Sequence, residues 1–225
     1  MRMETKRFVT FTGLWSNNES VKRFPKKKPH DFVACADSGY FLCKAAGIKP
    51  DIVIGDFDSL SKDIVSEIES LGIECIMHPG EKDDTDTMLC VKYGIALGYD
   101  DFVIIGGIGG DFGHTMANVQ VLSFLTDMEC GAVIVTEREK LFMADGLVSF
   151  SGRPGAKFSV FSFTETCTGV FVTNAKYELE DDVLTLSSPV GVRNEFINED
   201  PVTVSLLSGR LLVIVERKKQ IFKKK

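Results

Sequence analysis

The chain has 225 residues, of which 44% are hydrophobic and 26% charged, and its formal net charge is −6. This length allows one large domain or two small ones with a buried core, and the composition is ordinary for a globular protein in water. The acidic balance argues against a general nucleic-acid binder, which needs a basic surface, but not against a nucleotide substrate.

The first 135 or so residues alternate short apolar runs with helix-like segments. Within residues 85–97, Met88, Val91 and Ile95 fall at spacings of three and four and form one apolar stripe. Strand–helix alternation predicts an α/β domain, built on a parallel sheet that is covered by helices on both faces. The strands are expected at 7–11, 32–35, 52–54, 73–77, 102–105 and 132–135, and the helices at 40–46, 62–71, 85–97 and 115–128.

The pattern changes after about residue 138. Ser208-Gly209 looks like a hairpin turn, and Gly, Asn and Asp separate short apolar runs, several of which alternate with period two. We therefore expect a small all-β sandwich domain, and place the two domains at residues 1–137 and 138–225. Its strands are predicted at 157–163, 169–172, 183–186, 202–207 and 211–215.

The sequence gives no sign of export or of a membrane partner. Met1–Arg7 is charged and has no apolar segment behind it, as a secretory signal would require. No apolar run approaches the roughly 20 residues of a membrane span. The six cysteines show no CxxC spacing, which is typical of reduced thiols, so we expect a cytoplasmic protein.

Acidic residues gather where predicted strands and helices meet turns. Asp37, and then Asp56 and Asp58, follow two of the strands, and Lys82–Asp86 opens a helix. Such strand ends are where α/β proteins place their chemistry. Two carboxylates about 4 Å apart repel by roughly 4 kcal/mol at an effective dielectric constant of about 20. A fold that gathers several therefore favours a hard cation, Mg²⁺ or Ca²⁺, between them.

The spacing of these acids suggests how they share an ion. In an extended segment the side chains of Asp56 and Asp58 leave the same face and can bind one cation. Asp83 and Asp86 share a face if the helix includes both. The alternative is helix capping, because acids favour first turns. Capping accounts for one acid of the set and not for all of them.

Gly106–Gly110 lies between an apolar strand and a predicted helix. Glycines let backbone N–H groups approach an anion, and a helix N-terminus adds partial positive charge. The run is neither a GxGxxG nor a Walker A motif, so it is a weak signal alone, but beside an acidic metal site it suits a nucleotide phosphate. His114, which follows, is either a helix-start residue or a catalytic base.

The order and spacing of these motifs resemble the thiamine pyrophosphokinase family. The resemblance covers nearly the whole chain, since Gly191–Phe196 is similar to the family's thiamine-binding turn and Ser208–Val213 to its last hairpin. In the first domain it rests on Ala36-Asp37-Ser38-Gly39, on Gly47–Asp51 with Gly55-Asp56-Phe57-Asp58-Ser59, and on Lys82-Asp83-Asp84-Thr85-Asp86-Thr87.

The resemblance implies an α/β catalytic domain that binds ATP and Mg²⁺, and a β-sandwich domain that helps to bind thiamine. It implies transfer of pyrophosphate from ATP to the thiamine hydroxyl, which gives thiamine diphosphate and AMP. It also implies a homodimer with active sites between the subunits. Two alternatives are a degenerate member that only binds thiamine or nucleotide, and a nucleotide hydrolase that uses water.

By the same resemblance, Asp56, Asp58 and Asp86 are expected to bind Mg²⁺ and the polyphosphate and to act in catalysis. One carboxylate, Asp86 or Asp58, would accept the hydroxyl proton. The other residues expected to contact metal, nucleotide or thiamine are Asp37, Lys82, Asp83, Gly107, Gly110, Asp111, His114, Arg193 and Asn194.

Three positions depart from the family's pattern. Asp111 replaces an arginine, Gly113 replaces an aspartate, and Arg193 stands where the family usually has serine. A unit charge about 6 Å away is worth roughly 3 kcal/mol at an effective dielectric constant of about 20, which matters for a polyphosphate. We expect Asp111 to take over from the acid missing at 113, and Arg193 to face the ATP phosphates.

Overall fold

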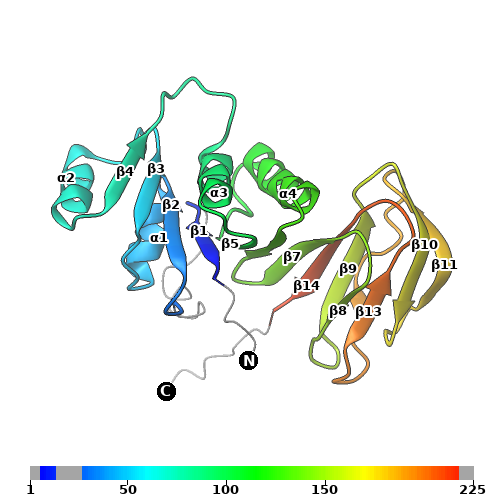
Figure 1. Ribbon diagram of the computed structural model, residues 1–225. Helices are drawn as coiled ribbons and strands as arrows, with labels where there is room; N and C mark the ends of the chain where they lie inside the picture. The colour runs from blue at the N-terminus through cyan, green and yellow to red at the C-terminus, as the bar shows by residue number, and fades with distance from the viewer. Residues whose placement is uncertain (1–5, 14–26, 218–225) are drawn as a thin grey trace, which may run out of the picture. The chain divides into compact units, whose positions relative to one another are not determined.

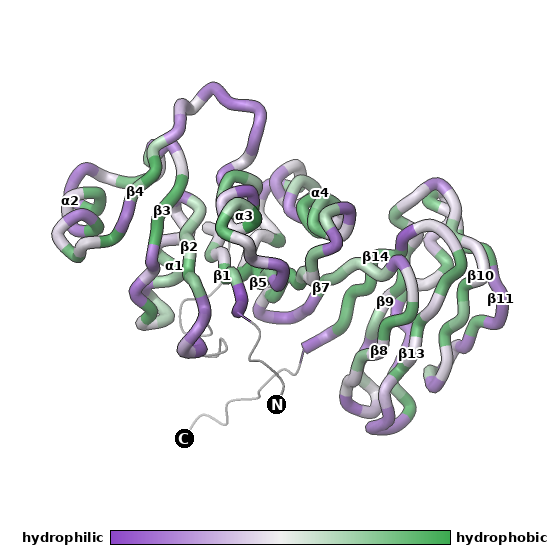
Figure 2. The backbone as a smooth tube through the Cα atoms, viewed as in Figure 1, coloured by the Kyte–Doolittle hydropathy of each residue, from purple (hydrophilic) through white to green (hydrophobic). Residues whose placement is uncertain are grey.

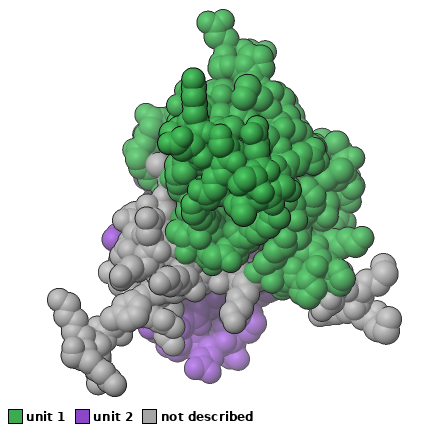
Figure 3. Space-filling model, turned by 90° about the vertical axis from the view of Figure 1, so that its left-hand side faces the viewer, with its two compact units in different colours: residues 1–137 green, residues 138–225 purple. Residues whose placement is uncertain are grey.

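The computed structural model describes residues 6–13 and 27–217. The chain divides into two compact units, Met1–Glu137 and Arg138–Lys225, which are coloured separately in Figure 3. The first unit is α/β with parallel strands and the second is antiparallel (Figure 1), so the fold class predicted from the sequence is confirmed. Within the described residues, no helix is both long and apolar enough to cross a membrane.

The first unit contains parallel strands in the order β6-β5-β1-β2-β3-β4. All six strands expected from apolar runs are present, and their ends differ from the prediction by at most one residue. Their bounds are β1 (Phe8–Phe11), β2 (Phe32–Ala36), β3 (Ile52–Gly55), β4 (Glu74–Met77), β5 (Asp101–Ile105) and β6 (Gly131–Val135).

Helices cover both faces of these strands. α1 (Gly39–Ala45) and α2 (Lys62–Ser70) pack with Val9, Val33 and neighbouring strand residues in one apolar cluster. α3 (Asp86–Ala96) contacts β1, β2 and β3, and its Gly94 packs against the rings of Phe8 and Phe102. Because successive strand residues point to opposite faces, α3 covers the face opposite to α1. α4 (Phe112–Asp127) contacts α3 and β6.

The strand order reverses beside β1. From β1 to β4 each new strand is added on one side of its predecessor, and α3 then leads to β5, which pairs with the other side of β1. The connections that leave β1 and β5 therefore diverge at the carboxyl ends of these strands. In open α/β sheets, ligands bind in the crevice at such a switch point.

A half-buried ion pair lies at the opposite, amino ends of β1 and β2. Arg7 and Asp31 are joined by a contact of 2.6 Å, and their side chains are 14% and 2% exposed. The backbone N–H of Lys28 also donates to Asp31. Burial raises the pKa of Asp31, but the hydrogen bonds from Arg7 and Lys28 outweigh it and hold that pKa below its ordinary value.

Replacing Arg7 by Met is expected to cost about 3 kcal/mol in the free energy of unfolding at pH 7, because it leaves a buried charge without its partner. Urea unfolding measures the loss. The loss should shrink as pH falls through the depressed pKa of Asp31, since stability from a lowered carboxyl pKa is present only at higher pH. Lys27→Met is the control, because its pair with Asp51 is more exposed, at 33% and 38%, and should contribute under about 1 kcal/mol. Equal losses in the two variants would contradict the expectation.

The second unit consists of antiparallel strands in the orders β12-β9-β14-β7 and β11-β10-β13-β8. The strands β7, β8 and β12 were not expected from the sequence. The bounds are β7 (Glu139–Ala144), β8 (Val148–Phe150), β9 (Lys157–Ser162), β10 (Thr166–Thr173), β11 (Leu179–Thr185), β12 (Asn194–Glu195), β13 (Val202–Ser205) and β14 (Leu211–Glu216).

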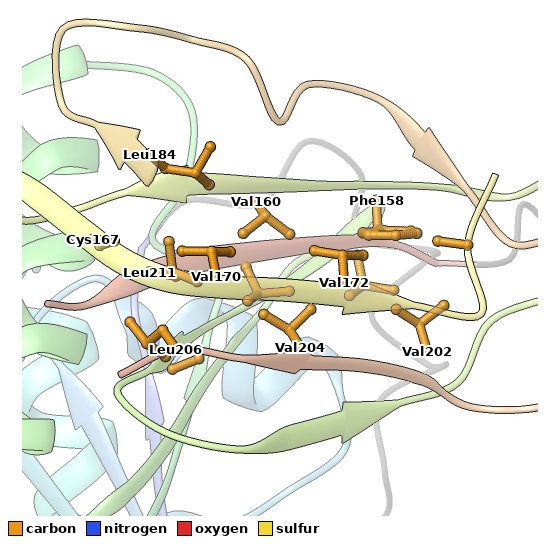
Figure 4. Close-up of a cluster of buried hydrophobic side chains, with 14 of the residues drawn as sticks. Phe158, Val160, Cys167, Val170, Val172, Leu184, Val202, Val204, Leu206 and Leu211 are labelled. Atoms are coloured by element: carbon orange, nitrogen blue, oxygen red, sulfur yellow. The ribbon is translucent and has the colours of Figure 1, made fainter. Parts of the chain in front are cut away.

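The core of this unit lies between its two sets of strands. Figure 4 shows Phe158 and Val160 of β9 and Leu211 of β14 beside Val172 of β10 and Val204 of β13. Alternate residues of β9, β13 and β14 are buried, as a sandwich requires.

The predicted hairpin at Ser208-Gly209 is wrong. These residues join β13 to β14, which belong to different sets of strands, and Ser208 instead forms a bridge with Thr168. Gly209, at φ 94°, lets the chain pass from one layer of the sandwich to the other.

Candidate functional site

A pocket of about 510 Å³ lies at the carboxyl ends of the parallel strands. Its walls come from the turns after β1, β2, β3 and β5, from the loop between β4 and α3, and from the first turns of α3 and α4. Figure 2 shows the hydrophilic colouring of the loop from β4 to α3. The volume is in the range of small-molecule sites. Seven charged residues expected at the site line this pocket, namely Asp37, Asp56, Asp58, Lys82, Asp83, Asp86 and Asp111.

Three carboxylates converge in the pocket. Asp37, Asp56 and Asp58 each offer an oxygen, and these atoms all lie within 4.8 Å of one another. Asp37 follows β2 and Asp56 follows β3, and these two strands are neighbours in the sheet. The structure therefore places Asp37, rather than Asp86, in the closest group of acids.

The backbone reaches this arrangement through a turn and not through an extended segment. Phe57, between Asp56 and Asp58, has φ 60°, and Asp37 has φ 43°. The prediction that an extended chain aligns Asp56 and Asp58 is therefore wrong in its geometry, although their carboxylates do meet. Left-handed conformations at residues other than glycine cost on the order of 1–3 kcal/mol each, and such strain clusters at functional sites.

Asp37 gives the clearest sign that a ligand belongs in this group. Its side chain is buried, and its Oδ2 accepts a hydrogen bond from Ser59 Oγ. Its Oδ1 is also buried but has no hydrogen-bond partner among the described residues. A buried carboxylate oxygen without a partner is costly, and a cation would satisfy it. Three carboxylates form the hard oxygen set that suits Mg²⁺.

Asp56 and Asp58 differ in how readily they hold a proton. The hydrogen bond from the backbone N–H of Asp58 is the main cause that lowers the pKa of Asp56. The charge of Asp56 in turn raises the pKa of Asp58. Without a cation, Asp58 is therefore easier to protonate than Asp56. We expect cation binding at this group to weaken as pH falls through the pKa of Asp58.

Lys82 occupies the space between two acids of the site. Its Nζ is 2.6 Å from Asp86 Oδ1 and 3.8 Å from Asp56 Oδ2. Burial lowers the pKa of Lys82, but the hydrogen bond and charge of Asp86 outweigh this and leave that pKa above its ordinary value. Asp86 is therefore engaged by Lys82 and lies next to the group formed by Asp37, Asp56 and Asp58.

The start of α3 differs from the prediction. The helix begins at Asp86, and Thr85 caps it, because Thr85 Oγ1 accepts a hydrogen bond from the backbone N–H of Met88. Asp83 lies before the helix, so the expected shared face of Asp83 and Asp86 is wrong. None of these acids is the N-cap, but Asp86 does lie in the first turn of the helix, where an acid is favoured. Asp84 instead pairs with Lys92.

The glycine turn after β5 forms another wall. Gly107 has φ 77°, and a Cβ there would lie 2.9 Å from Asn118 Nδ2 and 3.1 Å from Thr12 Oγ1. Asn118 Nδ2 donates to Gly107 O at 2.8 Å, and Thr12 Oγ1 donates to Ile105 O at 3.1 Å. Thr12 and Asn118 therefore fix this turn, and both line the pocket.

Sequence reasoning missed Thr12 and Asn118. Two signals could have found them. Thr12 directly follows the apolar run of β1, and Asn118 lies at helical spacing after Asp111 and His114, on the same face of α4. Gly110, expected at the site, belongs to the same turn with φ 64° but is not among the described residues that line the pocket.

Asp111 caps α4. Its Oδ1 accepts a hydrogen bond from the backbone N–H of His114 at 2.8 Å and lies 3.0 Å from His114 Nδ1. This cap starts the helix at Phe112, three residues before the predicted start at 115. The hydrogen bonds from His114 lower the pKa of Asp111. Both side chains are exposed and line the pocket.

Two substitutions separate the capping role of Asp111 from a role of its charge. Asp111→Ala removes the acceptor for the N–H of His114 and should cost about 1 kcal/mol of stability, whereas Asn caps nearly as well as Asp. If the charge replaces the acid missing at 113, both variants lower kcat at saturating Mg²⁺. A near wild-type kcat for Asp111→Asn would show that Asp111 is a cap alone.

Arg193 and Asn194 belong to the second unit. The Asn194 side chain is buried, its Oδ1 accepts from the backbone N–H groups of Tyr177 and Glu195, and its Nδ2 donates to Tyr177 O. Asn194 thus ties β12 to the segment at Tyr177. Arg193, at φ 58°, donates its backbone N–H to Ser159 Oγ and exposes its side chain. Contacts of these two residues with a ligand stay predictions.

Two family models match most of the chain. Residues 26–134 match the model described as "Thiamin pyrophosphokinase, catalytic domain", and residues 148–211 match "Thiamin pyrophosphokinase, vitamin B1 binding domain". The chain is 27% identical over 180 residues to "Thiamine pyrophosphokinase" of Bacillus subtilis (strain 168), which covers 79% of this chain and 84% of the relative. It is 22% identical over 189 residues to "Thiamin pyrophosphokinase 1" of Caenorhabditis elegans, covering 77% and 73%.

Solved structures share the fold. The crystal structure of thiamine pyrophosphokinase from Bacillus subtilis superposes with a TM-score of 0.83 at 22% identity, covering 95% of this chain and all of the other. Thiamin pyrophosphokinase from Candida albicans gives a TM-score of 0.78 at 16% identity, covering 96% of this chain and 90% of the other. At these identities the likeness shows the fold.

Proposed function

Because the chain belongs to the thiamine pyrophosphokinase family, we propose that it transfers pyrophosphate from ATP to the hydroxyl of thiamine, with Mg²⁺, giving thiamine diphosphate and AMP. The observation that carries the proposal is the pocket at the carboxyl ends of the strands, where Asp37, Asp56 and Asp58 converge and Asp37 keeps a buried oxygen without a partner. The first unit, residues 1–137, would bind ATP and Mg²⁺, and the second, residues 138–225, would bind thiamine.

The acid group would bind Mg²⁺, and the glycine turn would contact the phosphates of the nucleotide. Asp37, Asp56 and Asp58 would bind Mg²⁺, which when bound supplies positive charge to the polyphosphate. The backbone at Gly107 lines the same pocket and suits an anion, whereas the N-terminus of α4 already holds the carboxylate of Asp111. Lys82 is a cation of the same wall, close enough to the acids to meet a phosphate that they and Mg²⁺ hold.

The chemistry needs little from the protein beyond positioning and charge. The thiamine hydroxyl oxygen attacks the β-phosphorus, the bond from that phosphorus to the oxygen it shares with the α-phosphate breaks, and AMP leaves. Such transfers depend mainly on alignment of the reactants and on neutralisation of the phosphates. With Asp56 and Asp58 engaged at the cation, Asp86 is the carboxylate left to accept the hydroxyl proton, and its ion pair with Lys82 fixes its position.

We also propose a cytoplasmic location and a homodimer with active sites between subunits. The unpaired thiols of all six cysteines support the first, because disulfides are rare in reducing compartments. The family resemblance supports the second, and sedimentation of the purified chain measures it. The intact acid group speaks against the alternative of a non-catalytic binding protein, since such a protein gains nothing from a repulsive cluster.

Product identification tests the proposed activity. The purified chain is incubated with ATP, Mg²⁺ and thiamine, and the products are separated and identified by mass. We expect thiamine diphosphate and AMP in equal amounts, and no reaction when thiamine is omitted. Absence of turnover would point to the binding protein, and nucleotide breakdown independent of thiamine would point to a hydrolase.

A further inference from the structure

The ammonium of Lys82 lies between two acids of the pocket. It is within 4 Å of both Asp56 and Asp86, and the Lys82 side chain is only 15% exposed. Although Lys82 and Asp86 are four residues apart, they are not a pair on a helix surface, because α3 begins only at Asp86. The loop between β4 and α3 places Lys82 beside Asp86 at the start of the helix, and also close to Asp56.

A second lysine of the same region has different surroundings. Lys92 of α3 pairs with Asp84 at 2.6 Å, but its side chain is 48% exposed. Exposed pairs of this kind contribute little and are screened by salt. The two lysines can therefore be compared directly. Lys82 contacts two carboxylates in the pocket wall, whereas Lys92 forms one exposed ion pair.

The ammonium of Lys82 supplies positive charge between two carboxylates, as a bound metal ion would. Asp56 borders two positions for a cation. It belongs to the group with Asp37 and Asp58, and its carboxylate also faces Lys82. Asp86 would be the other ligand of a second ion, because it faces the same ammonium. A divalent ion and an ammonium cannot share this space, since like charges at such distances repel strongly.

We propose that Lys82 is a tethered counter-ion that takes the place of a second divalent cation between Asp56 and Asp86, so that the nucleotide-free chain binds one divalent ion. This inference rests on the metal group assigned under the proposed function. The first ion binds to Asp37, Asp56 and Asp58, where the buried Oδ1 of Asp37 lacks a partner among the described residues. Before ATP binds, the positive charge of Lys82 offsets the negative charges of Asp56 and Asp86.

The test counts bound Mn²⁺, used in place of Mg²⁺, on the full chain without nucleotide. The loss of the free-ion signal in electron paramagnetic resonance gives the number of ions per chain. We expect one ion for the wild type and two for Lys82→Met, which has a similar volume but no charge. Lys82→Arg keeps the charge and should bind one. Lys92→Met, the matched control, should also bind one.

A double variant ties the new ion to its expected ligands. Lys82→Met combined with Asp86→Asn removes one carboxylate of the second site and should return the count from two to one. Lys82→Gln serves as a second neutral variant if the Met variant unfolds, and circular dichroism reports the fold of each. One ion of unchanged affinity in both neutral variants would overturn the inference and leave the proposed function intact.

Two results for the wild type also decide the matter. Two ions on the wild-type chain would show that Lys82 does not exclude the second ion, and would overturn the inference alone. No bound Mn²⁺ at millimolar concentration would overturn it together with the metal group of the proposed function. The two failures are therefore distinguishable without any measurement of activity.

Discussion

Replacing Asp56 by Asn is expected to lower kcat/KM by roughly 1,000-fold, a loss typical of removing a main electrostatic group from an active site. Asp56 belongs to the group with Asp37 and Asp58, and its Oδ2 also faces Lys82. The substitution removes one charge from the proposed Mg²⁺ site. Because Asn keeps the shape and an oxygen that can accept from the backbone N–H of Asp58, the turn itself should persist. Initial rates over a range of Mg²⁺ concentrations measure the effect.

A matched variant shows whether the loss comes from the site. Asp63 is an exposed acid in the first turn of α2 and does not line the pocket, so Asp63→Asn makes the same change elsewhere. It should leave kcat/KM unchanged. The stability of Asp56→Asn should stay within about 1 kcal/mol of wild type, because the variant relieves repulsion with Asp58 as well as losing contacts. An Asp56→Asn enzyme within tenfold of wild type would contradict the assignment of Asp56.

Gly39→Ala is expected to destabilise the chain by about 3 kcal/mol and to lower activity with it. A Cβ at Gly39 would lie 2.0 Å from the backbone oxygen of Phe11 and 3.1 Å from Thr12 Cα. These are backbone atoms at the end of β1, so no side-chain rotation relieves the clash. Alanine is otherwise the better helix residue, but by only about 1 kcal/mol. The displacement would also move Asp37, two residues earlier.

Urea unfolding at constant pH gives the stability difference, and the Mn²⁺ affinity reports whether Asp37 has moved. Gly146→Ala is the control, because a Cβ there meets no atom within 4 Å and the backbone is not in the left-handed region. It should change stability by no more than about 0.5 kcal/mol. Equal stabilities of the two alanine variants would show that the backbone at the end of β1 can move to accommodate a Cβ at Gly39, and would contradict the prediction.

The strands of the first unit could be predicted because each is a buried apolar run between turns, a pattern that leaves little choice of structure. Helix starts could not be predicted so closely, since they depend on which side chain reaches a free backbone N–H. Thr85 does this for α3 in place of the neighbouring acids, and Asp111 does it for α4. β7 was missed because it opens with Glu139 and Lys140, and its pairing with β14 identifies it as a strand.

The site could be predicted as a set of strand ends but not as a set of contacts. Which strand ends meet depends on the order of strands in the sheet, which composition and periodicity do not give. β2 and β3 are neighbours, and this places Asp37 beside Asp56. Asp86 lies at the start of a helix and meets Lys82 first. A turn at Phe57, which no sequence pattern marked, brings Asp56 and Asp58 together.

The central claim is that pyrophosphate passes as one unit from ATP to thiamine at this pocket. Three reactions with ATP labelled separately at the α-, β- and γ-phosphorus, each with Mg²⁺ and thiamine, test it most directly. The account predicts that the β and γ labels both appear in thiamine diphosphate and that the α label appears only in AMP. Labelled ADP or inorganic phosphate as the main product, or AMP formed at the same rate without thiamine, would contradict it.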